Sequence, residues 1–182
     1  MNTPKKIAFT GGGTGGHIYP SLAVAAAFKE KHEPQIFYIG ASRGMDRAIV
    51  EDANLPFYGI CAGKLRRYVS LKNIIDLFKI LIGFFQALKI LAKERPALLF
   101  SKGGFVSVPP VLAAATLKIP VWTHESDFTP GLATKINARF AERVFTAYEN
   151  TALFFPPAGR SKIICVGNPV RDAFRNADAE RG

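Results

Sequence analysis

The sequence predicts an α/β fold in which a doubly wound parallel sheet carries helices on both faces. Apolar runs of strand length alternate with helical patterns along the whole chain, which is the pattern of a buried parallel sheet. A glycine-rich turn joins the first strand to the first helix, as in many sheets of this class. With 182 residues, the chain is long enough for one domain with a sizeable core.

The expected elements follow the apolar runs and turn residues in order. The first strand is the apolar run before the first glycine turn, and the helix after it has Pro20 near its first turn. A long apolar stretch defines the third helix, and the fourth strand leads into a second glycine turn. We expect strands at residues 5–10, 35–39, 57–60, 97–100, 119–123, 142–146 and 162–166. We expect helices at residues 19–32, 44–54, 71–94, 105–117 and 130–139.

The first glycine turn predicts an anion site. Five of the six residues from Gly11 to Gly16 are glycine, so the backbone can approach a ligand closely. The unpaired N–H groups at the start of the next helix favour an anion, so we expect a pyrophosphate near Gly13, Thr14, Gly15 and Gly16. The second strand ends without a ribose-binding carboxylate, and no Lys-Ser or Lys-Thr pair follows the glycines, which disfavours a dinucleotide or ATP site. A tight turn without a ligand stays open as the alternative.

Polar residues also follow the fourth and fifth strands. Because the first and fourth strands of such a sheet are neighbours, Lys102 should lie across a crevice from the first turn, although a solvated lysine is an alternative. His124, Glu125 and Asp127 should reach the same edge as His17. The His-Glu pair suggests acid/base chemistry, whereas no third ligand is spaced for a metal. Alternatively, Ser126 or Asp127 caps the next helix and His124 is structural.

The charge of the chain predicts an anionic partner. Lys and Arg number 24 against 14 Asp and Glu, and the net charge is +10. Phosphate groups or an anionic membrane surface fit this charge, and we expect no nucleic acid partner. The distant Cys61 and Cys165 suggest a reducing compartment. No signal peptide is visible at the start, and the longest uncharged apolar stretch is too short to span a membrane.

Residues 64–95 predict a membrane-binding surface. The segment is rich in lysine and arginine, and its helix is apolar around most of its circumference. Such a helix can lie on an anionic leaflet, unless a neighbouring loop or a dimer partner covers it. The predicted contact residues are Arg66, Arg67, Lys72, Ile75, Lys79, Phe84 and Phe85.

Four motifs together resemble the MurG family of bacterial cell-wall N-acetylglucosaminyltransferases, in the order that the family has them and over almost the whole chain. They are residues 12–20 (GGTGGHIYP), 101–107 (SKGGFVS), 124–133 (HESDFTPGLA) and 167–171 (GNPVR). Ser126, Asp127 and Phe105 stand where many members have two amides and a tyrosine.

The resemblance implies the first Rossmann-like domain of an inverting GT-B glycosyltransferase that needs no metal or other cofactor. Residues 1–170 would form the acceptor-binding domain, and residues 171–182 would begin the linker to a donor-binding domain that this chain lacks. The reaction would move N-acetylglucosamine from UDP-N-acetylglucosamine to an undecaprenyl-pyrophosphate-linked acceptor at the cytoplasmic face of the plasma membrane. The alternatives are an acceptor-binding subunit that works with a separate donor-binding chain, and a non-catalytic anion- or membrane-binding module.

The same resemblance suggests roles for the motif residues. His17 is the first candidate for the general base, and Glu125 is either the alternative base or the residue that orients His17. A third alternative is that His17 only forms a hydrogen bond to the substrate. The donor would contact Thr14, Gly15, Gly16, Asn168 and Arg171. The acceptor and its pyrophosphate would contact Gly13, Thr14, Gly15, Gly16, Lys102, Gly103, Gly104, Phe105, His124, Ser126 and Asp127.

Overall fold

The computed structural model describes residues 6–32, 34–63 and 71–170. In chain order the strands and α-helices are β1 (Lys6–Thr10), α1 (Gly15–His32), β2 (Gln35–Ala41), α2 (Asp46–Asp52), β3 (Phe57–Ile60), α3 (Leu71–Glu94), β4 (Leu98–Ser101), α4 (Val108–Thr116), β5 (Val121–Glu125), α5 (Leu132–Phe140), β6 (Arg143–Thr146) and β7 (Ile163–Cys165). Three 3₁₀ segments complete the described part: η1 (Phe105–Ser107), η2 (Glu149–Phe154) and η3 (Pro157–Lys162).

The described strands form one sheet with the order β3-β2-β1-β4-β5-β6-β7, and all neighbours are parallel. The predicted doubly wound sheet is therefore confirmed. The strand order reverses between β1 and β4, where Thr10 lies beside Ser101. Ligands of such sheets bind outside the carboxyl ends of the strands at this reversal.

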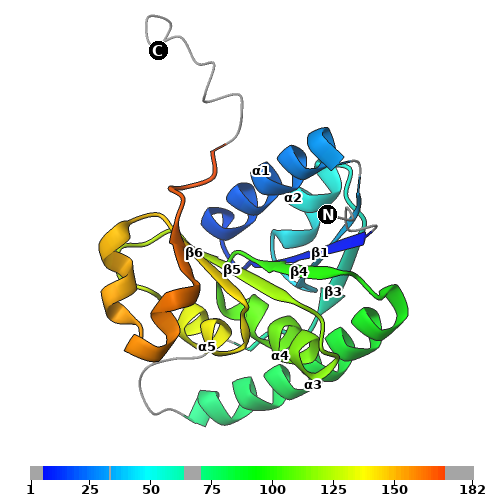
Figure 1. The fold of residues 1–182 in the computed structure, drawn as a ribbon. Helices are drawn as coiled ribbons and strands as arrows, with labels where there is room; N and C mark the ends of the chain where they lie inside the picture. The colour runs from blue at the N-terminus through cyan, green and yellow to red at the C-terminus, as the bar shows by residue number, and fades with distance from the viewer. Residues whose placement is uncertain (1–5, 33, 64–70, 171–182) are drawn as a thin grey trace, which may run out of the picture.

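Two apolar layers hold the helices to the sheet, one on each face (Figure 1). On one face, α1 and α2 bury Ile18 and Val50 against the strands. On the other face, α3, α4 and α5 bury side chains such as Leu91 and Val111. Because every central strand is covered on both sides, its sequence is apolar at consecutive positions rather than at alternate ones.

The helix α1 begins at Gly15, four residues earlier than the predicted start at residue 19. Pro20 therefore lies inside the helix instead of near its first turn, at the loss of one backbone hydrogen bond. Ile18 is fully buried against the sheet, and this packing offsets the loss. As a result His17 lies in the helix, at its N-terminal end.

The strands β2, β4 and β5 extend slightly beyond their predicted ends, because pairing with a neighbour continues. Ser101 pairs with Thr123, and Glu125 pairs with Thr146. His124 and Glu125 therefore belong to the last two positions of a strand rather than to a loop. The segments η2 and η3 were not expected, because their sequence lacks a helical apolar period.

Candidate functional site

Two glycine turns pack directly against each other at the carboxyl edge of the sheet. A side-chain carbon added at Gly104 would lie 2.6 Å from the carbonyl oxygen of Gly12 and 2.8 Å from the His17 ring. Gly104 also has a positive φ of 78°, which L side chains rarely adopt. The predicted approach of the two turns across the strand reversal is thus confirmed, and only glycine permits it.

A buried carboxylate that the sequence analysis missed holds the first turn. Asp46 is 1% exposed, and its two oxygens accept hydrogen bonds from Gly13 N (3.1 Å) and Ala41 N (2.9 Å). The Asp46 carboxylate packs so closely on Gly12 that a side chain there would overlap it. The N–H group of Gly13 therefore already has an anionic partner. The signal was an acidic residue a few positions after the second strand, at the start of a helix.

The free donors of this turn are those at the beginning of α1. The first N–H groups of a helix have no acceptor within it, so those of Gly15 and Gly16 are available to a ligand. A side chain at Gly16 would meet no atom nearer than Thr14 Oγ1 at 3.9 Å, so the space above Gly16 is open. The geometry favours an anion over Gly15 and Gly16 rather than beside Gly13.

His17 joins the two turns and is held in one tautomer. Its Nδ1 lies 3.2 Å from the carbonyl oxygen of Lys102, and a carbonyl can only accept, so Nδ1 carries the proton. This leaves a lone pair on Nε2. Burial, followed by the nearby charge of Lys102, lowers the pKa of His17 below its ordinary value. His17 is therefore a neutral imidazole at pH 7, which is the form that a general base needs.

Lys102 is a buried cation beneath the second turn. It is 1% exposed, and its ammonium group donates a hydrogen bond to Ser126 Oγ, so the alternative of a solvated lysine is wrong. Burial lowers its pKa to about 8, and the charges of Glu125 and Asp127 oppose that shift. This buried positive charge acts on both His17 and His124, and it adds to the attraction for an anion at this edge.

Glu125 ties the loop that follows β5. Its carboxylate oxygens accept hydrogen bonds from Asp127 N (2.9 Å) and Gly131 N (3.1 Å), and the side chain is 5% exposed. Because both oxygens already hold backbone groups, the geometry fits a structural carboxylate better than a base. The helix α5 has Gly131 at its N-cap without a side-chain cap, so the alternative of Ser126 or Asp127 as its cap is wrong.

His124 connects the sheet edge to the last described segment. Its Nε2 donates a hydrogen bond of 2.9 Å to the carbonyl oxygen of Gly167. Burial and the Lys102 charge lower the pKa of His124 to about 4, so the ring is neutral. This bond fixes the backbone just before Asn168, whereas Arg171 lies outside the described residues.

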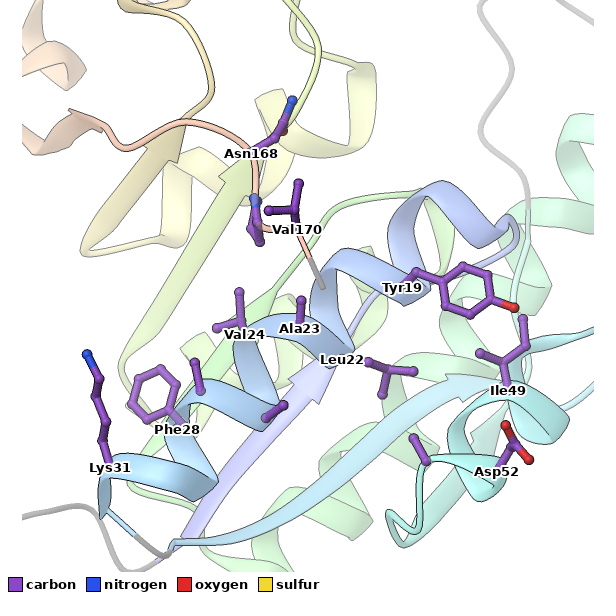
Figure 2. A pocket seen from close by; sticks show the side chains of 14 residues that line it. Tyr19, Leu22, Ala23, Val24, Phe28, Lys31, Ile49, Asp52, Asn168 and Val170 are labelled. Carbon is purple, nitrogen blue, oxygen red and sulfur yellow. The ribbon is translucent and has the colours of Figure 1, made fainter. Parts of the chain in front are cut away.

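A large cavity lies beside this edge rather than at it. It measures about 710 Å³ and runs along the outer face of α1 between α2 and residues 168–170 (Figure 2). Apolar side chains such as Val24 and Phe28 line most of it, and Lys31 stands at one end. His17 and Lys102 do not line it. Asn168 borders this groove together with Tyr19 (Figure 2).

The remaining predicted contacts divide between the edge and its surroundings. The Phe105 ring packs over Gly13, and Gly103 lies against Thr134 of α5. Phe105, Gly103 and Lys102 thus lie close to the first turn or to His17, and their contact with an acceptor stays a prediction. Across the described residues, no group of three metal-binding side chains lies close enough to hold an ion.

The helix α3 exposes a row of large apolar side chains. Each of them is at least half exposed: Ile75, Leu77, Phe78, Leu81, Ile82 and Phe85. Lys79 stands among them and pairs with Asp76 at 3.3 Å. Phe84 is half-buried and packs against the core, so it contributes less to the surface than predicted. Arg66, Arg67 and the Lys72 side chain lie outside the described part. Within the described part, the helices are too short or too polar to cross a membrane.

Comparison of the chain with known proteins places it in one protein family. Residues 7–146 match the model of the glycosyltransferase family 28 N-terminal domain. The chain is 56% identical, over 100% of its length, to the UDP-N-acetylglucosamine–N-acetylmuramyl-(pentapeptide) pyrophosphoryl-undecaprenol N-acetylglucosamine transferase of Treponema pallidum, of which it covers 47%. It is 48% identical to the transferase of the same name from Staphylococcus epidermidis, over 97% of the chain and 49% of that protein.

Solved structures agree with this result. The crystal structure of Acinetobacter baumannii MurG matches with a TM-score of 0.74 and 29% identity, over 97% of this chain and 47% of that one. A UDP-GlcNAc 2-epimerase from Neisseria meningitidis shares the fold, with a TM-score of 0.67 and 15% identity over 93% of this chain and 48% of that one. The chain spans about half the length of the curated relatives it matches. From these matches, the chain belongs to the glycosyltransferase family 28 N-terminal domain family.

Proposed function

We propose that this chain is the acceptor-binding half of an inverting transferase that moves N-acetylglucosamine from UDP-N-acetylglucosamine to undecaprenyl-pyrophosphoryl-N-acetylmuramyl-pentapeptide. The observation that carries the proposal is the edge where two glycine turns meet a neutral His17 and the buried cation Lys102. A chain that is 56% identical to a transferase of that name adds support.

The acceptor pyrophosphate fits above Gly15 and Gly16. Two available N–H groups, the positive end of the α1 dipole and the Lys102 charge all attract a dianion there. Gly103, Gly104 and Phe105 border the same space from the second turn. Ser126 would act near the acceptor through its hydrogen bond with Lys102, and Asp127 would act from the exposed loop after β5.

His17 is the proposed general base. Its Nε2 takes the proton of the acceptor sugar's 4-hydroxyl while that oxygen forms the new bond to the anomeric carbon of the donor. The bond from the anomeric carbon to the UDP oxygen breaks, and its electron pair leaves with UDP. The Lys102 carbonyl keeps Nδ1 protonated, so the lone pair stays on the nitrogen that reacts. Glu125 is the weaker candidate because backbone groups occupy both of its oxygens.

The donor is proposed to bind mainly to a second half such as the longer relatives carry. The first residues of the α1 turn, together with Asn168 and Arg171, would contribute from this half. The helix α1 is apolar on its outer face as well as on its inner face, and such a helix is usually covered on both sides. We therefore expect the second half to contact the α1 groove (Figure 2).

The α3 surface is proposed to rest on an anionic membrane, where the lipid-linked acceptor resides. Six large apolar side chains on one helix face would enter the interface, and Lys79 would meet anionic head groups. This arrangement would place the enzyme at the cytoplasmic face of the plasma membrane.

The proposal is tested by titrating the chain with a short-chain pyrophosphoryl-N-acetylmuramyl-pentapeptide in a calorimeter. Gly16→Val fills only the open space above the turn, so it should preserve the fold and weaken binding at least tenfold. Ala92→Val, which also introduces valine at an exposed helical position but lies on α3, is the matched control. Equal affinity of the Gly16 variant and the wild type would refute the proposed pyrophosphate position. We also expect no transfer by this chain alone, since the donor half is required for closure.

A further inference from the structure

A second cavity lies beside α5. It has a volume of about 310 Å³ and is enclosed by α5, β6 and the segments η2 and η3. Figure 1 shows these segments, in yellow to orange, beside α5. Its apolar lining includes Ala138, Val144 and Phe155, all of which are buried. The size is at the lower end of the range for small-molecule sites.

Three cations surround this apolar floor. Lys135 and Arg139 lie one turn apart on the same face of α5, and Lys162 ends η3. No acidic side chain is among the residues that line the cavity. None of the three cations forms an ion pair with another described residue. Like charges on one rim repel each other, so an anion placed between them would be stabilised.

Side chains of η3 fix the backbone around the cavity through hydrogen bonds. The Lys162 ammonium donates to the carbonyl oxygens of Ala138 and Ala141, which leaves one N–H for a ligand. Arg160 donates to the carbonyl oxygens of Phe155 (3.1 Å) and Leu153 (3.2 Å) and so braces η2. Because two carbonyls already offset the Lys162 charge, Lys135 and Arg139 supply most of the attraction for an anion.

We propose that this cavity binds an amphipathic phosphate, with its head group between Lys135, Arg139 and Lys162 and a short apolar segment on the floor formed by Ala138, Val144 and Phe155. A planar guanidinium beside two ammonium groups suits the several oxygens of a phosphate. The apolar floor selects a phosphate that carries an alkyl chain over a free phosphate ion. This site is separate from the glycine turns and does not depend on their proposed function.

The test is titration of the whole chain with octyl phosphate, followed by two-dimensional NMR of the backbone amides. Saturable binding should shift the resonances of α5, η2 and η3, and octyl phosphate should bind at least tenfold more tightly than either inorganic phosphate or octanol. Lys135→Gln/Arg139→Gln should weaken it at least tenfold. Lys29→Gln/Lys93→Gln removes two exposed charges elsewhere and should leave the affinity unchanged.

Three outcomes would overturn this assignment: no saturable binding, shifts confined to the glycine turns or α3, or equal affinity of the Lys135/Arg139 double variant and the wild type. Both rim residues are exposed and make no described side-chain hydrogen bond, so the double variant should fold. Vesicles that contain an anionic phospholipid, tested in a Phe78→Ser background that weakens the α3 contact, separate the two sources of such a head group. Loss of vesicle binding in the double variant assigns a bilayer lipid, and unchanged vesicle binding with lost octyl phosphate binding assigns a soluble phosphate.

Discussion

Replacing Lys102 by methionine should stabilise the fold and weaken anion binding at the same time. Burial lowers the pKa of Lys102 from 10.5 to about 8, so keeping it charged at pH 7 costs roughly 3 kcal/mol. Methionine has a similar shape and carries no charge, but it loses the hydrogen bond to Ser126, which contributes about 1 kcal/mol. The expected net gain is about 2 kcal/mol in the free energy of unfolding, or a rise of about 4–8 °C in Tm.

The pH dependence gives the sign of this effect. The pKa of Lys102 is lower in the folded state than in the unfolded state, so between about pH 8 and 10.5 the unfolded chain holds more protons. Wild-type stability should therefore rise with pH across this window, and the advantage of Lys102→Met should shrink. Urea unfolding of both proteins at pH 7 and at pH 10.5 measures the difference directly. Calorimetric titration with pyrophosphate at pH 7 should show at least tenfold weaker binding for the variant.

One result would refute this reasoning. If Lys102→Met lost more than about 1 kcal/mol at pH 7, the charge of Lys102 would be holding the fold through Glu125 and Asp127 rather than straining it. A stability gain that persisted unchanged at pH 10.5 would equally contradict the assignment, because the wild-type lysine is neutral there.

Three further predictions concern other parts of the molecule. Asp46→Asn removes a buried charge that accepts two backbone hydrogen bonds, so urea unfolding should show that the free energy of unfolding falls by about 2–4 kcal/mol. A fall of less than about 1 kcal/mol would contradict the role of Asp46 in holding the first glycine turn. Nitrogen-15 NMR should find His17 protonated on Nδ1 and His124 on Nε2, with His17 titrating below 6.5 and His124 near 4; a midpoint above 7 for either ring would contradict the described burial. Phe78→Ser should lower the affinity for anionic vesicles about tenfold without loss of stability. The control Leu153→Ser, at an equally exposed position on η2, should change neither the vesicle affinity nor the stability. Equal vesicle binding by the two variants would show that α3 does not contact the membrane.

Local sequence signals were sufficient to predict the elements of the sheet. Each predicted strand is present, and its ends lie within two or three residues of the predicted ends, because a strand buried on both faces needs a continuous apolar run. The glycine turns were predictable for a similar reason, since their backbone conformations exclude side chains. Gly104, with its positive φ and its contact with Gly12, is an example. Both signals depend on residues that are near one another in the chain.

The tertiary structure alone decided what the polar residues of the site do. The sequence predicted that Glu125 and Lys102 lie at the sheet edge. It did not predict that Glu125 holds the backbone of its own loop or that Lys102 is fully buried. It gave no reason to connect Asp46 with Gly13, which is 33 positions away. Similarly, the proton positions of the two histidines depend on carbonyl groups brought close by strand pairing.

The sequence by itself therefore determined the fold class, the strand and helix order and the two glycine turns. The tertiary structure decided which backbone donors are already paired, which charges are buried and which helix face remains uncovered. The physical reason is that burial of an apolar run is a property of consecutive residues, whereas hydrogen-bond partners and desolvation depend on groups that only folding brings together.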